Sequence, residues 1–250
     1  MYLRPTLMSS RQRQLAQQAG RLAGLALFLA TLPGCQSIAG SPSLAQVRIV
    51  DASPDAPALD VYQGSGVIVY NLGYPNFTSY VPFTPGTYPI GVDKSGSQQQ
   101  LITATGTFNA NAQYTVLIGN YVASLQEQIL SPDQNQPAPA GQVSFRFLDQ
   151  APAIGPVDIY LVPSNGTLLT TKPIATGVSF NSNTGYINVA SGTYAIVTLA
   201  SGTVPTSTTA SLDTATSVYY PSGAARTVVL LGNPLQTTPA LLVNILGDYE

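Results

Sequence analysis

Apolar and polar residues alternate in short segments along the chain after residue 45. The clearest examples are "QVRIVD" (46–51) and "QVSFRFLD" (142–149), in which apolar residues recur at every second position. This two-residue alternation predicts strands with one buried face. The other segments are rich in Val, Ile, Tyr, Phe and Thr, have Gly, Pro, Asn or Asp between them, and show no sustained helical period. We therefore expect an all-β protein with little helix outside its N-terminal signal peptide.

A repeated pattern divides the chain into two similar halves. Three pairs of segments align, at offsets of 98, 106 and 113 residues: "VRIVDASPDAPALDVY" (47–62) with the end of "SFRFLDQAPAIGPVDIY" (144–160), "YVPFTPGTY" (80–88) with "YINVASGTY" (186–194), and "YTVLIGN" (114–120) with "TVVLLGN" (227–233). Because the same pattern occurs twice, the repeat is stronger evidence for the domain organisation than a single motif would be. We predict two tandem β-sandwich domains, immunoglobulin-like or transthyretin-like, at 46–130 and 142–250. The Pro-containing segment 131–141 is the expected linker.

The first 34 residues have the pattern of an export signal. Arginines precede the apolar run "LAGLALFLATL" (22–32), which is shorter than the roughly 20 residues of a membrane-spanning helix. The "LPGC" at 32–35 resembles the lipobox of bacterial lipoproteins, in which the cysteine becomes lipidated. We therefore expect a signal peptide at 1–34 and a tether at 35–45 that is lipidated at Cys35. A secreted protein cut further along the chain and an uncleaved anchor are the alternatives.

The composition limits the location and chemistry of the exported chain. By resemblance to Gram-negative lipoproteins, Gln36 implies sorting to the outer membrane, facing the periplasm or the exterior. Without the signal peptide, five basic residues remain against eleven acidic ones (5 − 11), a net charge of −6, which disfavours binding to nucleic acid. The sequence has no histidine and its single cysteine is Cys35, so it offers no Ser-His-Asp or Cys-His arrangement and no imidazole zinc site. We expect a protein that is not an enzyme, with calcium as the one cofactor left open.

The repeated segments also resemble a known family. "VRIVDASPDAPALDVY", the "PGTY" hairpin (85–88) and "YTVLIGN" are similar to bacterial repeats catalogued as domain of unknown function 4397, found in exported and lipid-anchored proteins, often in tandem. The resemblance covers nearly all of 46–130 and, with "DQAPAIGP" in place of the "ASPDAP" signature, extends to 142–250. It implies a compact β-sandwich at the cell envelope. It implies no activity, substrate or catalytic residue.

The stretch "ASPDAPALDVY" (52–62) and the residue before it concentrate the acids of the chain. Asp51, Ser53, Asp55 and Asp60 offer oxygen ligands, and calcium takes about 6–8 oxygens. Asp55 and Asp60 would be the carboxylate pair to test for glycoside hydrolysis. The alternative is a tight turn, capped by Asp51 and Ser53, in which Asp55 accepts hydrogen bonds from neighbouring backbone N–H groups.

Three charged residues of the first copy recur in the second, whereas two of the oxygen ligands do not. The recurring pairs are Arg48 with Arg146, Asp51 with Asp149, and Asp60 with Asp158. A cation site in the second copy would lack two of its ligands and would bind weakly. An arginine–carboxylate ion pair could form in both copies, because its residues recur. The recurrence therefore predicts a structural ion pair in each copy. The spacing leaves open which aspartate is the partner.

Aromatic residues cluster in "YNLGYPNFTSY" (70–80). Tyr70, Tyr74 and Phe77 are candidate ligand-binding residues, because exposed rings on a loop can stack on sugar or peptide faces. The alternative is that Tyr80, matched by Tyr186, faces the core and that Tyr74 packs over the edge of a sheet.

The sequence thus predicts a non-catalytic, lipid-anchored protein of the cell envelope. Its role would be that of a structural or binding module, and its partner an envelope protein or a glycan. The alternative function is a calcium-stabilised or calcium-dependent adhesin that uses the Asp cluster of the first copy.

Overall fold

The computed structural model describes residues 43–250. These residues form seventeen strands and two short 3₁₀ helices, η2 (Val122–Ser124) and η3 (Leu168–Thr170). The prediction of an all-β fold with little helix is confirmed. In this part of the chain no helix has the length and apolar character needed to span a membrane. The predicted signal peptide at 1–34 and the predicted lipid-attachment residue, Cys35, lie outside the described residues.

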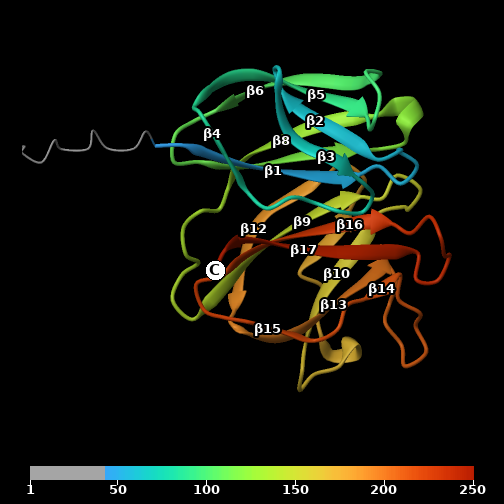
Figure 1. Cartoon of the computed structure of the whole chain (residues 1–250). Helices are drawn as coiled ribbons and strands as arrows, with labels where there is room; N and C mark the ends of the chain where they lie inside the picture. Colours follow the sequence, from blue (N-terminus) through green and yellow to red (C-terminus); the bar gives the residue numbers. More distant parts are fainter. Residues whose placement is uncertain (1–42) are drawn as a thin grey trace, which may run out of the picture. The chain divides into compact units, whose positions relative to one another are not determined.

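The first eight strands form two sheets (Figure 1). Sheet A has the order β4 (Val81–Phe83), β1 (Ala45–Ala52), β7 (Gln113–Gly119) and β8 (Gln126–Asp133). Sheet B has the order β3 (Gly66–Leu72), β2 (Leu59–Gln63), β5 (Gly86–Lys94) and β6 (Gln100–Phe108). Because β4 and β5 belong to different sheets, "PGTY" carries the chain from one sheet to the other, and the hairpin expected there is absent.

The remaining nine strands repeat this arrangement. Sheet C has the order β12 (Asn183–Ala190), β9 (Gln142–Gln150), β16 (Ala225–Gly232) and β17 (Leu241–Tyr249). Sheet D has the order β11 (Ala175–Val178), β10 (Val157–Pro163), β13 (Gly192–Ala200) and β14 (Asp213–Thr214), and β15 (Val218–Tyr220) also pairs with β13. Sheets C and D therefore correspond to sheets A and B, except that two short strands, β14 and β15, pair with β13 where the single strand β6 pairs with β5. Strand β8 ends at Asp133, so strand structure extends into the segment expected as a linker.

Each sandwich buries an apolar core between its two sheets, because alternate residues of each strand point inward. Val47 and Ile49 of β1 lie in the first core. Phe145 and Phe147 of β9 lie in the second, with their rings stacked at 6.0 Å between centroids. These are positions that the alternation in the sequence predicted to be buried.

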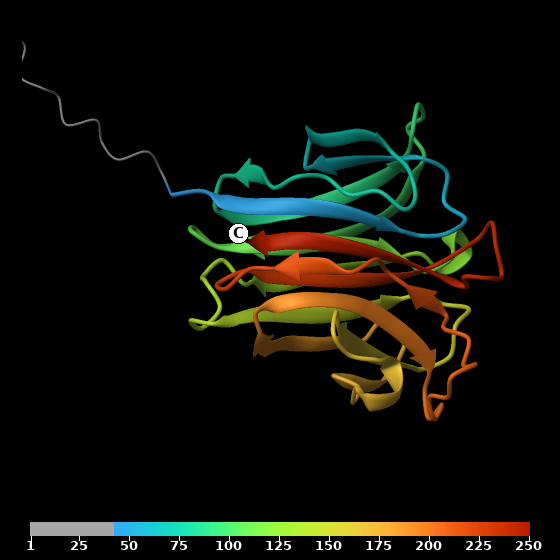
Figure 2. The ribbon, with the colours of Figure 1, turned by 90° about the horizontal axis from the view of Figure 1, so that it is seen from below.

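Sheets A and C also pack against each other, so both are buried on their two faces. The apolar side chains between them come from the central strands β1, β7, β9 and β16 and from the edge strands β8 and β17: Val50, Ala52, Leu117, Leu130, Leu148, Val229, Leu231 and Leu246. In each sheet the central pair is parallel, β1 with β7 and β9 with β16, as is usual for strands covered on both sides. Figure 2 shows the layers edge-on, in the order B, A, C and D.

Strand pairing fixes which residues of the two sandwiches correspond. Arg48 lies opposite Thr115 in the β1–β7 pair, and Arg146 lies opposite Thr227 in the β9–β16 pair. The third pair of aligned segments is therefore offset by 112 residues (227 − 115), and the predicted offset of 113 is wrong by one residue. The error arises because the two segments share Thr-Val at an offset of 112 and Gly-Asn at an offset of 113. An alignment without a gap that matches Gly-Asn therefore shifts the strand by one position.

Candidate functional site

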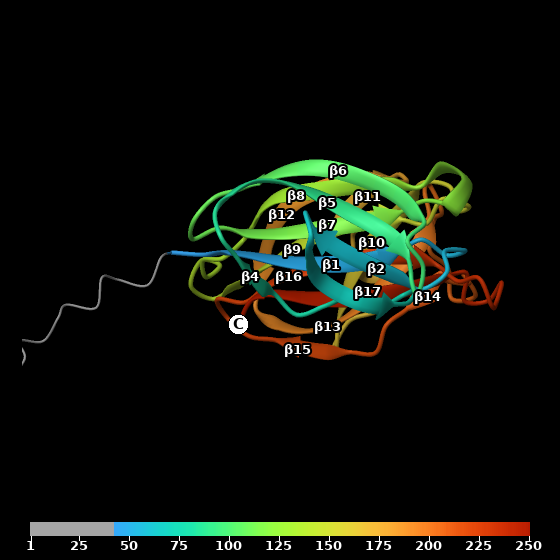
Figure 3. The ribbon, with the colours of Figure 1, turned by 45° about the horizontal axis from the view of Figure 1, so that its top comes forward.

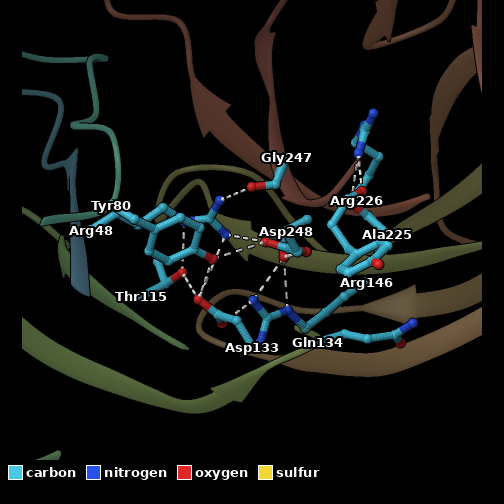
Figure 4. A network of polar contacts seen from close by, with 12 residues as sticks. Arg48, Tyr80, Thr115, Asp133, Gln134, Arg146, Ala225, Arg226, Gly247 and Asp248 are labelled. Atoms are coloured by element: carbon cyan, nitrogen blue, oxygen red, sulfur yellow. Dashed lines mark hydrogen bonds and ion pairs between the residues drawn. The ribbon is translucent and has the colours of Figure 1, made fainter. Parts of the chain in front are cut away.

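A buried network of charged groups lies between sheets A and C (Figure 4). Arg48 of β1 donates to Asp248 of β17, with 2.5 Å between Nη2 and Oδ1. Arg146 of β9 donates to Asp133 of β8, with 2.6 Å between the same kinds of atom. None of these side chains is more than 3% exposed. The short contacts are crosswise, because each arginine donates to the carboxylate of the other sandwich. Arg48 also lies 3.8 Å from Oδ2 of Asp133 in its own sandwich.

Hydroxyl groups hold each carboxylate from within its own sandwich. The donors to Oδ2 are a threonine and a tyrosine in both cases: Thr115 (2.6 Å) and Tyr80 (2.8 Å) for Asp133, and Thr227 (2.6 Å) and Tyr186 (2.9 Å) for Asp248. Oδ1 of each carboxylate is thereby left for the arginine of the other sandwich. Two cations and two anions balance, and every carboxylate oxygen accepts a hydrogen bond, which is the condition under which buried ions are tolerated.

The two tyrosines also cover the arginines. The Cζ atom of Arg48 lies 4.8 Å from the ring centroid of Tyr80, and that of Arg146 lies 4.8 Å from the ring centroid of Tyr186, within cation–π range. Burial raises the pKa of both phenol groups well above its ordinary value, so both stay protonated and donate. One of the two interpretations of the aromatic segment had Tyr80, matched by Tyr186, facing the core. The structure places both tyrosines in the charged layer between sheets A and C.

The four aspartates predicted as partners of the arginines lie elsewhere: Asp51, Asp60, Asp149 and Asp158. Arg48 and Asp51 are three residues apart in one strand, and residues at an odd separation point to opposite faces of a sheet. Asp51 therefore points to the same side as Ile49, into the first sandwich. Asp60 belongs to β2 of sheet B. The predicted partners are wrong for this geometric reason, and the same reasoning holds for the second copy.

Asp51 and Asp149 lie at corresponding positions inside their sandwiches. Oδ1 of each accepts a hydrogen bond from a backbone N–H two residues later, that of Ser53 at 3.1 Å and that of Ala151 at 2.9 Å. Within residues 43–250, Oδ2 of each is buried without a hydrogen-bond partner. Burial raises the pKa of Asp51 to about 7 and that of Asp149 to about 6. Each aspartate is thus a turn cap with a carboxyl group that titrates near neutral pH.

Asp60 and Asp158 connect neighbouring segments of sheets B and D. Asp60 accepts hydrogen bonds from the backbone N–H groups of Asn71 (2.8 Å) and Gly96 (3.2 Å). Asp158 accepts from the N–H groups of Gly177 (2.8 Å) and Gly202 (2.9 Å). The hydrogen bond from Asn71, more than any other effect, holds the pKa of Asp60 below its ordinary value. The aspartate that recurs before Val-Tyr and Ile-Tyr is therefore a structural connection in both copies.

A hollow of about 320 Å³ lies on the outer face of sheet B, the face turned away from sheet A. Figure 3 brings this side of the molecule forward. The lining side chains and backbone come from β2, β5, β6 and two turns: Tyr62, Gly64, Ser65, Gly91, Asp93, Gln98 and Gln100. Tyr70 of β3 is 63% exposed, and its ring meets that of Tyr62 edge to face with 6.2 Å between centroids. The hollow therefore combines aromatic rings with amide, hydroxyl and carboxylate groups.

The corresponding face of sheet D is closed. Tyr160, the counterpart of Tyr62, is only 3% exposed. It packs with Val197 and Leu199, and Leu168 of η3 packs against this cluster. The segment that contains η3 is longer than its counterpart in the first half, and it covers the outer face of sheet D with apolar side chains.

Strand pairing identifies the residues that differ between the two faces. Gly91 lies opposite Tyr62 as Val197 lies opposite Tyr160, and Asp93 lies opposite Asp60 as Leu199 lies opposite Asp158. Sheet D thus has two buried apolar residues, Val197 and Leu199. At the corresponding positions sheet B has Gly91 and Asp93, which are partly exposed. The two sandwiches share a fold and differ in what they present on this face.

The segment that contains the first sandwich, β9 and the first part of β10 is similar to a known family. Residues 45–160 match the family described as Domain of unknown function (DUF4397). The DUF4397 match includes the "ASPDAP" signature and all of the residues that line the hollow. It ends at Tyr160, so most of the second sandwich lies beyond it. No curated protein matches the chain.

Three solved structures show weak similarity. A family 26 carbohydrate-binding module from Eubacterium rectale Amy13K, in complex with maltoheptaose, is 11% identical, with 81% of this chain and 96% of that chain covered and a TM-score of 0.24. The Bacillus anthracis TIE protein is 8% identical, with 76% of this chain and 34% of that chain covered and a TM-score of 0.25. A streptococcal virulence factor that binds alpha-glucan is 12% identical, with 74% and 92% covered and a TM-score of 0.23. TM-scores this low support no inference about the ligand of the DUF4397 segment.

The DUF4397 segment does not bring the predicted calcium ligands together. Asp51 caps the turn at Ser53, and Asp55 accepts a hydrogen bond from the backbone N–H of Val122 at 2.8 Å. Asp60 is held in sheet B by its two backbone donors. In the described part of the chain, no three His, Cys, Asp or Glu side chains are grouped so that they could hold a metal ion. The predicted ligands serve as separate caps and connections because they point to different sides of the strands.

The three aromatic residues predicted to bind a ligand do not form one site. Tyr70 stands beside the hollow. Tyr74 is half-buried among the apolar residues between sheets A and C, and its hydroxyl donates to the carbonyl of Gly232. Phe77 is 43% exposed and forms an isolated bridge with Val50 of β1.

Sequence reasoning missed all seven residues that line the hollow, among them Tyr62, Gly91 and Asp93. A signal for two of them existed in the repeat. "YPIGVDK" (88–94) and "YAIVTLA" (194–200) align at the offset of 106, which pairs Gly91 with Val197 and Asp93 with Leu199. These outward-facing differences mark the position at which the two copies diverge in surface chemistry.

Proposed function

We propose that this protein is a non-enzymatic binding module of the bacterial cell envelope, held at the outer membrane by a lipid on Cys35, which binds an envelope component on the outer face of sheet B. The observation that carries the proposal is the contrast between the two sandwiches. The outer face of sheet D is covered by the chain itself, whereas sheet B keeps Tyr62 and Tyr70 beside an open, polar hollow. An open face with aromatic rings is typical of a recognition surface.

The chemistry of the hollow supports binding rather than catalysis. Its lining includes one carboxylate, that of Asp93, whereas glycoside hydrolysis ordinarily requires two. The nearest acid in the strand pairing, Asp60, is occupied by two backbone N–H donors. The sequence also contains no histidine that could act as a general base. The charged groups buried between sheets A and C are paired with one another, so they serve to hold the two sandwiches together.

Retention on isolated outer membranes tests this function. Purified protein with Cys35→Ser, which removes the lipid, should co-sediment with outer-membrane fragments. Tyr62→Ala combined with Tyr70→Ala should reduce the retained fraction at least about fivefold, because aromatic side chains contribute most to such contacts. Phe77→Ala is the matched control, since it removes an exposed ring away from the hollow. Equal retention of the double variant and the control would contradict binding at this face.

Cell fractionation tests the lipid anchor. In a Gram-negative host, the wild-type chain should be labelled by a radioactive fatty acid and should be found with the outer membrane after cell lysis. Cys35→Ser should abolish the label, because the thiol that carries the acyl chains is gone. Combined with Tyr62→Ala and Tyr70→Ala, which weaken binding at sheet B, it should also release most of the protein into the soluble fraction. Ser37→Ala, a change two residues away, should behave as the wild type. Labelled Cys35→Ser protein, or membrane retention of this triple variant equal to that of Tyr62→Ala combined with Tyr70→Ala alone, would refute the anchor at this residue.

A further inference from the structure

We infer that the hollow on sheet B binds a sugar ring of a neutral glycan. This inference rests on the proposed function, because it names the ligand class of the same face. The lining includes a hydroxyl from Ser65, amides from Gln98 and Gln100 and the carboxylate of Asp93. These groups place hydrogen-bond donors and acceptors close together. The hydroxyl groups of a sugar, each of which donates and accepts, can bond to such a set.

The absence of positive charge from the lining favours a neutral ligand. None of the seven residues that line the hollow is a lysine or an arginine, and Asp93 is an acid. Asp60 lies opposite Asp93 in the neighbouring strand. Burial is the largest cause of the raised pKa of Tyr62, and the negative charges of Asp60 and Asp93 raise it further. Tyr62 therefore keeps its proton and remains a hydrogen-bond donor. Phosphates and acidic sugars would be repelled by this field.

The aromatic residues suit the apolar side of a sugar ring. A pyranose presents C–H groups on its faces and hydroxyl groups around its edge, so it requires a ring surface and polar groups together. Tyr62 and Tyr70 provide the ring surface, since they meet edge to face and Tyr70 is 63% exposed. The volume of about 320 Å³ is at the lower end of the range of about 300–1,000 Å³ for ligand pockets. A volume of this size suits a small ligand such as a sugar ring.

Gly91 provides the space that this ligand needs. It lies within β5, its φ is outside the left-handed region, and a Cβ atom added to it would first meet Nε2 of Gln100 at 3.4 Å. The backbone therefore does not require glycine here. A glycine inside a strand is typical of a place where a ligand approaches the backbone closely. Sheet D, whose outer face is covered, has Val197 at the corresponding position.

Gly91→Val separates ligand binding from folding. The change introduces the residue that sheet D uses, and β-branched residues favour strands, so the melting temperature should stay within about 2 °C of the wild type. The valine should fill the hollow next to Tyr62 and weaken binding at least about tenfold. Gly155→Val is the matched control, because that glycine is outside the left-handed region and has open space around its Cβ position.

Affinity electrophoresis measures the binding directly. Native gels containing soluble starch, hydroxyethyl cellulose or galactomannan are run with the Cys35→Ser protein and with both glycine variants in the same background. At least one of these neutral polysaccharides should retard the parent protein and Gly155→Val, and should not retard Gly91→Val. No retardation in any of the three gels, or equal retardation of Gly91→Val, would overturn the inference.

Competition separates this inference from the proposed function. Soluble neutral polysaccharide, added in excess, should release the protein from outer-membrane fragments. If retention depends on Tyr62 and Tyr70 but the polysaccharide does not compete, the face binds a peptide or another component, and the sugar assignment fails while the binding function stands. If the tyrosine variants are retained as well as the wild type, the proposed function itself fails.

Discussion

Asp248→Asn should lower the free energy of unfolding by about 3–5 kcal/mol. The change leaves the guanidinium of Arg48 buried and without the anion that it now contacts at 2.5 Å, and an uncompensated buried charge is costly. The hydroxyl groups of Thr227 and Tyr186 can still bond to an amide at this position, so the loss reports mainly on the charge. Urea-induced unfolding at pH 7, followed by tyrosine fluorescence, measures it.

Glu250→Gln is the matched control for this substitution. It makes the same acid-to-amide change at the partner of Arg226, where the carboxylate side chain is 84% exposed, so it should change stability by less than about 1 kcal/mol. Adding Arg48→Met to Asp248→Asn should recover much of the loss, because the unpaired charge is removed as well. A cost for Asp248→Asn no larger than that for Glu250→Gln would show that the network does not hold the sandwiches together.

Raising the pH from 4 to 7.5 should remove about 4 kcal/mol of stability through Asp51 alone. Burial raises the pKa of Asp51 from 3.8 to about 7 in the folded protein, and each pKa unit corresponds to about 1.4 kcal/mol. Between these two values the folded state binds more protons than the unfolded state. The contribution of Asp51 to stability is therefore greatest below pH 4 and falls as the pH rises through about 7.

The variant Asp51→Asn should lack this part of the pH dependence. The measured quantity is the difference in unfolding free energy between wild type and variant at pH 4, 5.5 and 7.5, so the contributions of Asp149 and Glu127, whose pKa values are also raised, cancel. Ser53→Ala, a change at the buried residue that bonds to Asp51, removes no titrating group and should keep the wild-type slope. Parallel curves for wild type and Asp51→Asn would contradict a raised pKa at this carboxyl.

The sequence predicted the all-β fold and the inward-facing residues because alternation reports directly on which face of a strand is buried. It also identified Arg48 and Arg146 as charged residues with a structural role. It failed on their partners for two physical reasons. Asp133 and Asp248 lie at the ends of their sandwiches' last strands, outside the aligned segments, and each serves the arginine of the other copy. Comparison of one copy with the other cannot reveal a contact between them.

The candidate site was harder to predict than the fold. Crowded charge drew attention to Asp51, Asp55 and Asp60, but strand geometry sends these side chains to different places. The hollow depends instead on Gly91, a residue that matters through the side chain it lacks. Its importance becomes visible only when sheet pairing aligns it with Val197 and the cover over sheet D is seen.

The crosswise exchange of arginines and aspartates has the form of an isologous contact between two identical subunits, in which one residue of each partner binds the reciprocal residue of the other. The two halves of this chain are thus arranged as a homodimer whose subunits have been fused. Gene duplication followed by fusion would account for this arrangement, since a contact that once joined two copies would already be in place within one polypeptide. Fusion also freed the halves to diverge, which is how one outer face could acquire a cover while the other stayed open.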